Sequence, residues 1–195
     1  MPKIVDHDQR RAEIVRIIIK VIAEDGLNNA TVRTISRRGG FSSGVISHYF
    51  TNKDEMIRFA FDAVADSAAM RTEKRLVAEK GIGRVRAIIE EHVPVGKNRD
   101  EAAVAIAFWE MAIHDQALRK VFRAKYDRWR GFLRRELQNL LNGVDDEEIE
   151  RRVDLAVSAS DGLMVRLAID GRRSLLEDRG QAINFLISTL GVSEA

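Results

Sequence analysis

Apolar residues recur at helical spacing near the start of the chain. Ile14, Ile18 and Ile22 lie four residues apart, whereas Arg16 and Lys20 fall on another face. This spacing places the isoleucines along one side of a helix and does not show the two-residue alternation of a strand. Gly26 follows directly, and glycine commonly ends helices. The pattern therefore predicts a helix over about residues 7–25.

Similar periodicity continues along the rest of the chain. Hydroxyl residues stand where helix N-caps are expected, with Thr31 before the second helix and Ser42 or Ser43 before the third. Thr51, followed three residues later by Asp54, resembles a capping box ahead of the fourth helix. The further predicted helices cover about residues 32–38, 43–50, 53–79, 83–93, 100–114, 116–141, 145–170 and 174–190. The predicted fold class is all-α, with about nine helices.

A small N-terminal unit precedes a larger one. The first four helices carry enough apolar side chains for a small core of their own, and the long helix at residues 53–79 leads away from them. We therefore expect an N-terminal domain over residues 1–53 and a helical body over residues 54–195.

The N-terminal unit has the dimensions of a helix-turn-helix, in which two short helices flank a turn that contains glycine. Gly39 and Gly40 supply the turn, because glycine adopts backbone angles closed to other residues. A small apolar cluster would hold the two helices at a fixed angle; its members are Ile35, Val45, Ile46 and Phe50. An ordinary helical hairpin inside a bundle is the alternative interpretation.

The second short helix begins with small polar residues, which suits entry into a DNA major groove. Ser42, Ser43 and Gly44 form this first turn. Positive side chains on either side are placed to neutralise backbone phosphates, namely Arg33, Arg37, Arg38 and Lys53. The pattern favours a nucleic-acid-binding head.

Charge supports this head, and composition narrows the class of protein. Among 195 residues there are no cysteines and two prolines, which excludes a disulfide scaffold and favours long helices. The net charge is +2, but residues 1–53 carry +4 (nine Lys and Arg against five acids) and the remainder carries −2 (23 against 25). A basic N-terminal unit favours a polyanionic partner, although an excess of this size also arises by chance.

Neither a membrane location nor enzyme chemistry is indicated. No apolar run reaches the roughly 18–20 residues of a membrane span, and the polar N-terminus does not resemble a signal peptide, so we expect a cytoplasmic protein. Residues 40–44 match the G-x-S-x-G of serine hydrolases, but that motif needs a preceding strand, and the pattern here is helical. A serine hydrolase is kept only as a remote alternative. The four histidines lack metal-ligand spacing, and no cofactor is expected.

Residues 31–53, TVRTISRRGGFSSGVISHYFTNK, resemble the N-terminal signature of TetR-family transcriptional regulators. The run GVISHYF at residues 44–50 is most similar to the BetI-like branch, whose members control choline and glycine betaine genes. Ser36 and Gly39 stand where alanine is usual, and Phe41 stands where valine is usual.

The resemblance implies roles for individual residues of the head. Arg33 and residues 42–47 would face base edges, whereas Lys53 would grip a phosphate. His48 and Tyr49 would also hold phosphates, with half-buried packing as the alternative for both. The complete predicted DNA-binding set is Thr31, Arg33, Ser42, Ser43, Gly44, Ser47, His48, Tyr49 and Lys53.

The body carries more aromatic residues than a minimal core needs, and the resemblance implies that it binds a small-molecule inducer. An aromatic cage for a quaternary ammonium compound is one interpretation, and plain core packing is the other. Met164 stands where the BetI-like branch leads us to expect tryptophan, which argues against choline itself. Glu110, Asp161 and Arg166 are the polar groups expected to be buried, with an exposed Arg166–Asp170 pair as the alternative. The predicted ligand-binding residues are Phe108, Trp109, Glu110, Tyr126, Trp129, Asp161 and Arg166.

The last two helices are apolar on more than one face, and the resemblance implies that they pair two chains into a homodimer. Two heads would then meet a palindromic operator in double-stranded DNA. The sequence therefore predicts a ligand-responsive repressor that an inducer releases from DNA. A non-enzymatic helical adaptor that merely keeps the fold is the alternative.

Overall fold

The computed structural model describes residues 7–170 and 173–192. Within these ranges the chain forms nine α-helices and two short 3₁₀ helices, and it contains no strand. The predicted all-α fold with about nine helices is confirmed. The α-helices are α1 (His7–Asp25), α2 (Val32–Gly39), α3 (Ser43–Tyr49), α4 (Lys53–Ala78), α5 (Ile82–His92), α6 (Asp100–His114), α7 (Gln116–Leu140), α8 (Asp146–Asp170) and α9 (Arg173–Thr189), and the 3₁₀ helices are Leu27–Asn29 and Gly96–Asn98.

Two of the predicted caps are confirmed. The Thr31 hydroxyl accepts a hydrogen bond from the Thr34 amide at 3.2 Å, and the Ser42 hydroxyl accepts one from the Val45 amide at 3.4 Å. Each bond satisfies an amide that the first helical turn leaves without a partner. Gly26, just after α1, has φ +83°, a backbone angle that glycine adopts without strain.

The capping box predicted before α4 is wrong by one residue. Asn52, not Thr51, is the N-cap, and its side-chain oxygen accepts from the Glu55 amide at 2.8 Å. The Glu55 carboxylate in turn accepts from the amide and the hydroxyl of Thr51, both at 2.7 Å. These bonds come first among the causes that lower the pKa of Glu55 below its ordinary value. Asp54 takes no part in this reciprocal arrangement.

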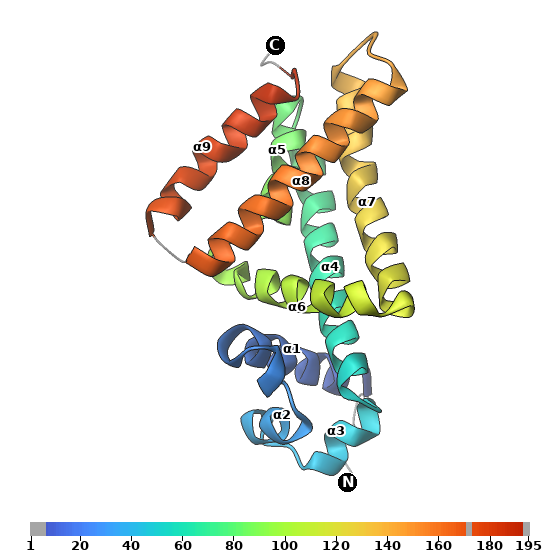
Figure 1. The fold of residues 1–195 in the computed structure, drawn as a ribbon, viewed down its shortest axis with the longest axis vertical. Coiled ribbons are helices and arrows are strands. Elements are labelled where there is room, and N and C mark those ends of the chain that lie inside the picture. Colours follow the sequence, from blue (N-terminus) through green and yellow to red (C-terminus); the bar gives the residue numbers. More distant parts are fainter. Residues whose placement is uncertain (1–6, 171–172, 193–195) are drawn as a thin grey trace.

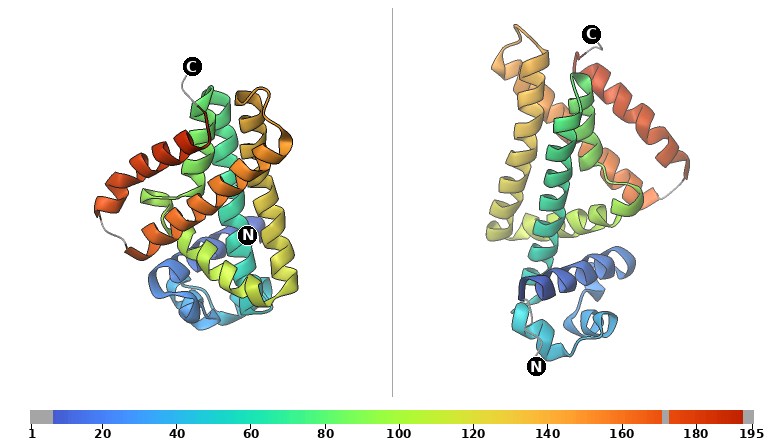
Figure 2. Two further views of the ribbon diagram at one scale, coloured as in Figure 1. Left: turned by 45° about the horizontal axis from the view of Figure 1, so that its top comes forward. Right: turned by 180° about the vertical axis from the view of Figure 1, so that it is seen from behind.

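The molecule has a small lower unit and a larger upper one, joined by α4 (Figure 1). α1, α2 and α3 make up the lower unit, which we call the head. α4 rises from the head past α6, which lies crosswise between the two units, and continues into the body beside α5 and α7 (Figures 1 and 2). α8 and α9 lie along one side of the body, and the C-terminal end is far from the head.

The hydrophobic core of the head continues into the body. Ile14 and Ile35 of the head belong to the same buried cluster as Val104 and Phe108 of α6. The ring of Phe108 stacks flat on Phe61 of α4, with ring centroids 3.9 Å apart. The first four helices therefore do not close a core of their own, contrary to expectation, because α6 supplies part of it. The division of the chain at residue 53 stays a prediction.

A second cluster occupies the centre of the body. It gathers buried side chains of α5, α7, α8 and α9, among them Ile88, Leu133, Val153 and Ile187. Among the helices that the structure describes, none is both long and apolar enough to cross a membrane.

Candidate functional site

The helix-turn-helix of the head is held by the apolar residues that its sequence suggested. Ile35 of α2 and Ile46 of α3 are completely buried, and Phe50 after α3 is nearly so. The turn between the helices depends on Gly40, whose φ of +67° lies in the left-handed region. Together these residues fix the angle between α2 and α3.

Gly39 serves a different purpose from the one expected. It is the last residue of α2 and has no left-handed backbone. A Cβ atom at this position would lie 2.5 Å from a ring carbon of Phe41 and 2.7 Å from the side chain of Ile17. Gly39 therefore allows the turn to pack closely against α1, whereas Gly40 alone supplies the unusual backbone angle.

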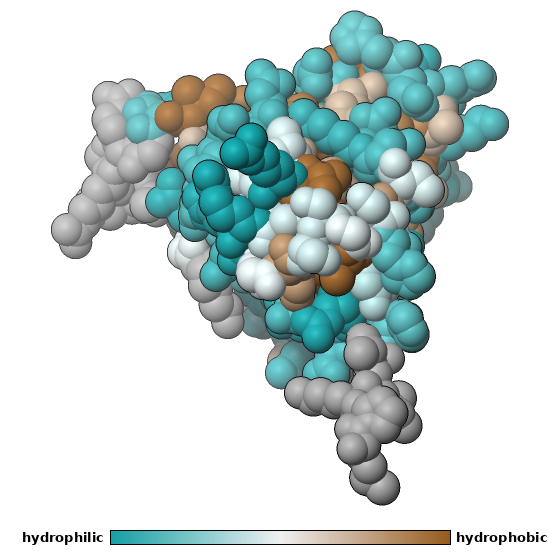
Figure 3. Space-filling model, turned by 90° about the horizontal axis from the view of Figure 1, so that it is seen from below, coloured by the Kyte–Doolittle hydropathy of each residue, from teal (hydrophilic) through white to brown (hydrophobic). Residues whose placement is uncertain are grey.

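Most of the predicted DNA-binding residues lie at the surface of the head. Seen from below, pale side chains of intermediate hydropathy occupy the middle of this face and hydrophilic side chains surround them (Figure 3). Tyr49 and Lys53 are half-buried, and the others are exposed: Thr31, Arg33, Ser42, Ser43, Gly44, Ser47 and His48. Within the described part of the chain, Arg33, Arg37 and Lys53 form no ion pair, so their charges stay available.

Arg38 forms ion pairs inside the head. Its guanidinium group donates to Glu24 and, at 2.9 Å, to Asp25, the two acids that end α1. The hydrogen bond to Glu24 is the first cause that raises the pKa of Arg38 above its ordinary value. These carboxylates neutralise Arg38 and tie α2 to α1, and its expected role in neutralising phosphate stays a prediction.

The end of α3 carries an aromatic cluster that includes one residue not expected from the sequence. The Tyr49 hydroxyl lies 3.0 Å from Nδ1 of His7, at the start of α1. The His48 ring lies edge-on to Tyr49 at 5.2 Å and is 6.0 Å from the His7 ring. His7 thus joins the end of α3 to the start of α1. Local sequence patterns could not predict this contact, because the two residues lie far apart in the chain.

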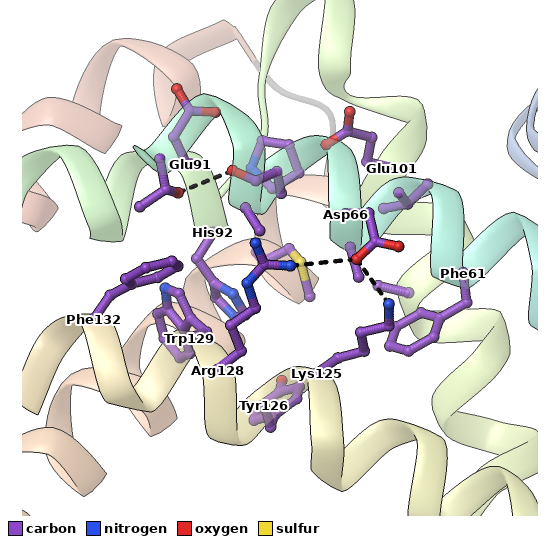
Figure 4. Close-up of a pocket in the computed structure, with 18 of the residues that line it drawn as sticks. Phe61, Asp66, Glu91, His92, Glu101, Lys125, Tyr126, Arg128, Trp129 and Phe132 are labelled. Atoms are coloured by element: carbon purple, nitrogen blue, oxygen red, sulfur yellow. Dashed lines mark hydrogen bonds and ion pairs between the residues drawn. The ribbon is translucent and has the colours of Figure 1, made fainter. Parts of the chain in front are cut away.

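The body contains a cavity of about 100 Å³. Its lining comes from α4, α5, α6, α7 and α8 and from the loop after α5, and it is mainly apolar and aromatic. Trp109 of α6 and Tyr126 and Trp129 of α7, all predicted ligand-binding residues, line it together. Figure 4 shows Tyr126 and Trp129 with His92 of α5 beside them. Phe61, Phe132 and His92 are lining residues that sequence reasoning missed.

A hydrogen-bonded triad lies at the aromatic end of the cavity. Oδ1 of Asp161 is 2.6 Å from Nε2 of His92, and it accepts a hydrogen bond from the Tyr126 hydroxyl at 2.7 Å. Burial, followed by the charge of Asp161, raises the pKa of Tyr126 far above its ordinary value. Tyr126 therefore keeps its proton and acts as a donor to the carboxylate.

Ion pairs between α4 and α7 lie at another part of the lining. Lys125 and Arg128 of α7 both reach Asp66 of α4, at 2.8 and 3.5 Å (Figure 4). Lys125 also lies 3.5 Å from Asp62, and Arg128 lies 2.8 Å from Glu73. These pairs join the helix that reaches the head to a helix of the body.

A second ionic cluster connects α4 to α5 and α6. Arg71 lies 2.7 Å from both Glu91 and Glu101, which line the cavity. Burial raises the pKa of Glu101 despite the opposing effect of Arg71. Arg71 thus neutralises Glu101, whereas Glu91 also has the guanidinium of Arg75 at 3.5 Å.

Four of the predicted ligand-binding residues do not line the cavity: Phe108, Glu110, Asp161 and Arg166. Asp161 reaches it only through its bonds to His92 and Tyr126. Phe108 is completely buried in the core that joins the head to α6. Glu110 and Arg166 are exposed, so the expectation that they are buried is wrong. Each lies one or two residues from an inward side chain, Trp109 or Met164, and a helix turns by about 100° per residue. They therefore point away from the cavity.

Neither metal chemistry nor hydrolase chemistry finds a place in the described residues. No group of three or more His, Asp or Glu side chains within them is arranged to hold a metal ion. Ser42, the serine of the hydrolase-like motif, caps α3 and follows the turn after α2, not a strand. The geometry that a nucleophilic serine needs is therefore absent there.

A helix-turn-helix head with an exposed small polar first turn, joined to a body with an aromatic cavity, defines the class of ligand-responsive DNA-binding regulators. Two family models match the chain: "Bacterial regulatory proteins, tetR family" over residues 14–59, and "BetI-type transcriptional repressor, C-terminal" over residues 82–185. The chain belongs to the TetR family of transcriptional regulators. It is a repressor of the BetI type, and it is not an enzyme.

Individual relatives agree with this assignment. The HTH-type transcriptional regulator BetI of Vibrio vulnificus is 28% identical over 175 residues, which cover 87% of this chain and 86% of the relative. BetI of Burkholderia ambifaria is 32% identical over 130 residues, covering 62% and 64%.

Two solved structures have the same fold. A Rhodococcus transcriptional regulator superposes with a TM-score of 0.83 at 26% identity, covering 95% of this chain and 98% of that one. A protein from Saccharomonospora viridis, described as a transcriptional regulator in complex with choline, gives a TM-score of 0.74 at 22% identity and covers 95% of each chain.

Proposed function

We propose that the protein acts in the cytoplasm as a homodimer whose two heads bind a palindromic operator, and that an organic cation in the body cavity releases it. The head is assigned to residues 1–53 and the body to residues 54–195. The observation that carries the DNA part is the exposed surface at the start of α3. Beside it lie Arg33 and Lys53, which form no ion pair with any residue that the structure describes.

The roles of Arg33 and Lys53 differ and can be separated. Arg33 presents a planar guanidinium that suits a bidentate contact to guanine, worth about 1–3 kcal/mol of discrimination. Lys53, half-buried at the start of α4, suits a phosphate, which every DNA sequence offers. In this proposal the remaining contacts to the DNA backbone and the major groove come from Thr31, Ser47, His48 and Tyr49.

Selection from a random duplex library, followed by fluorescence anisotropy titration, tests this assignment. Arg33→Ala should lower affinity for the selected operator by about 5- to 150-fold and leave binding to random DNA much less changed. Lys53→Ala should weaken both and reduce the salt dependence. Arg135→Ala removes an exposed charge at the opposite end of the molecule and serves as the control. Unchanged binding by both head variants would contradict the assignment.

Dimerisation through α8 and α9 is supported by large apolar side chains left in water. Leu155, Ile169 and Phe185 are 47%, 79% and 73% exposed, and all three lie on these two helices. A contiguous exposed apolar patch favours a protein interface, and α8 and α9 together would supply one in this proposal. Sedimentation analysis should find a dimer at micromolar concentration and a monomer for Phe185→Glu. Val77→Glu, at a 90% exposed apolar position on α4, is the matched control. A wild-type monomer would refute the paired-head mechanism.

The chemistry of the cavity favours a positively charged organic ligand. Trp109, Tyr126 and Trp129 supply aromatic faces that attract cations. Apart from His92, the lining side chains and their ionic partners hold six carboxylates and four cations: Asp62, Asp66, Glu73, Glu91, Glu101 and Asp161 against Arg71, Arg75, Lys125 and Arg128. The choline bound by the Saccharomonospora viridis protein supports the same ligand class.

Comparison of choline with its neutral carbon analogue, 3,3-dimethylbutan-1-ol, tests this ligand class. The two molecules have nearly the same shape and differ in charge, so a difference in affinity reports on the cation. Choline should bind about 2- to 30-fold more tightly, the range of a cation–π interaction. It should also release the protein from labelled operator DNA. Equal binding of the two molecules would contradict a cation-selective cavity.

A further inference from the structure

The aromatic surface best suited to a cation is already covered by a side chain of the protein itself. The imidazole of His92 stacks on the indole of Trp129, with ring centroids 3.6 Å apart and planes inclined by 14°. Tyr126 meets the same imidazole edge-on at 5.8 Å. His92 therefore occupies the face of Trp129 on which an organic cation would lie.

His92 also takes the carboxylate that would neutralise such a cation. Its Nε2 lies 2.6 Å from Oδ1 of Asp161. The same oxygen accepts a hydrogen bond from the Tyr126 hydroxyl. This bond between Tyr126 and Asp161 would remain if the His92 side chain moved away. The imidazole thus makes both contacts, to an aromatic face and to an acid, by which proteins recognise organic cations.

The size of the cavity agrees with a site that is partly filled. Ligand-binding pockets usually measure about 300–1,000 Å³, whereas this cavity measures about 100 Å³. Rotation of the His92 side chain would enlarge the space between Trp129, Tyr126 and Asp161.

The backbone on either side of His92 is held in place by α9. His92 is the last residue of α5. The carbonyl groups of Glu90 and Val93, on either side of it, accept hydrogen bonds from Arg179 of α9 at 2.7 and 2.8 Å. These bonds hold the backbone at the end of α5 in place. We therefore expect a ligand that enters this region to move the imidazole of His92 and not the helix.

We propose that His92 is a specificity-determining residue that fills the aromatic cage of the free protein, and that an organic cation binds by displacing its side chain. A successful ligand must replace both the ring contact and the bond to Asp161. A neutral molecule of the same shape replaces only the first. This inference rests on the organic-cation ligand proposed above.

Titration calorimetry with choline chloride tests the displacement. His92→Ala removes the competing side chain, so choline should bind at least about tenfold more tightly than to the wild-type protein. If His92 instead helped to hold the ligand, the same variant would bind choline more weakly. His114→Ala, at an exposed position at the end of α6, is the matched control and should leave the affinity unchanged. Weaker or unchanged binding by His92→Ala would overturn the proposal.

Nuclear magnetic resonance of the wild-type protein supplies a measurement that does not depend on how the variant folds. The chain has four histidines, and the His92 ring signal is identified by its absence from the His92→Ala spectrum. Stacking on Trp129 should shift this signal upfield, and choline should return it toward the position of free imidazole. A signal that stays shifted when choline is bound overturns the displacement while leaving the ligand class intact. Failure of both proteins to bind choline overturns the ligand class and the displacement together.

Discussion

The core that joins the head to α6 makes a quantitative prediction for Phe108→Ala. The Phe108 side chain is 0% exposed and stacks on Phe61 at 3.9 Å, so truncation leaves a cavity in tightly packed surroundings. Replacing a buried phenylalanine by alanine costs about 3–5 kcal/mol. For a chain of this length each kcal/mol lowers the melting temperature by about 2–4 °C, so we expect a fall of about 6–20 °C. Ile113→Ala, at a 65% exposed position on the same helix, should change stability by less than about 0.5 kcal/mol.

Two spectroscopic probes reveal whether the head and the body unfold together. Far-ultraviolet circular dichroism reports on all helices, whereas fluorescence reports on Trp109 and Trp129, both in the body. Because the core is continuous across α6, the two urea transitions should coincide in the wild-type protein and shift together in Phe108→Ala. An early loss of part of the circular dichroism, with the tryptophan signal unchanged, would refute the shared core. So would a Phe108→Ala variant as stable as Ile113→Ala.

Three further predictions concern stability alone. Gly40→Ala should cost about 1–2 kcal/mol in urea titrations, because φ is +67° there. For Glu55, hydrogen bonds from Thr51 place the folded-state pKa below the ordinary value of 4.5, so its contribution is present above pH 4.5 and is lost as the pH falls through the folded-state pKa. Stability curves of Glu55→Gln should therefore depend less on acid than those of the wild type. Arg71→Met should cost about 1–3 kcal/mol near neutral pH, since it leaves Glu101 without its partner. This loss should shrink at pH 4, where the carboxyl group becomes protonated, and a constant loss would show that the ion pair is not its origin.

Much of the head could be predicted from local sequence because its signals act over a few residues. Thr31 and Ser42 cap helices by bonding to amides three positions away, a geometry set by the helix itself. The predicted cap of α4 is one residue too early because Thr51 and Asn52 are both suitable N-cap residues. Only the backbone conformation shows that the helix begins after Asn52. The dual use of Gly39 and Gly40 was also hidden, since Ile17, which approaches Gly39, belongs to another helix.

The sequence predicted an aromatic ligand cavity in the body, but it did not predict all of the residues that line it. Aromatic residues of two successive helices indicated a ligand site, and Trp109, Tyr126 and Trp129 do line one cavity. Glu110 and Arg166 were expected to be buried, yet both face outward, because a shift of one or two positions on a helix turns a side chain by about 100–200°. A single histidine in a helical pattern does not indicate a ligand site, so His92 could not be predicted from the sequence. Its position in the cavity depends on the contact with Asp161, 69 positions away.

The sequence by itself determined the all-α fold, the positions of its helices and the family to which the chain belongs, because periodicity, caps and the motif at residues 31–53 are properties of short segments. Tertiary structure alone decided that the head shares its core with α6, that Arg38 is held by α1, and that His92 covers Trp129. Each of these contacts joins residues from different helices. Their distances depend on how whole helices pack, and no spacing along the chain encodes that packing.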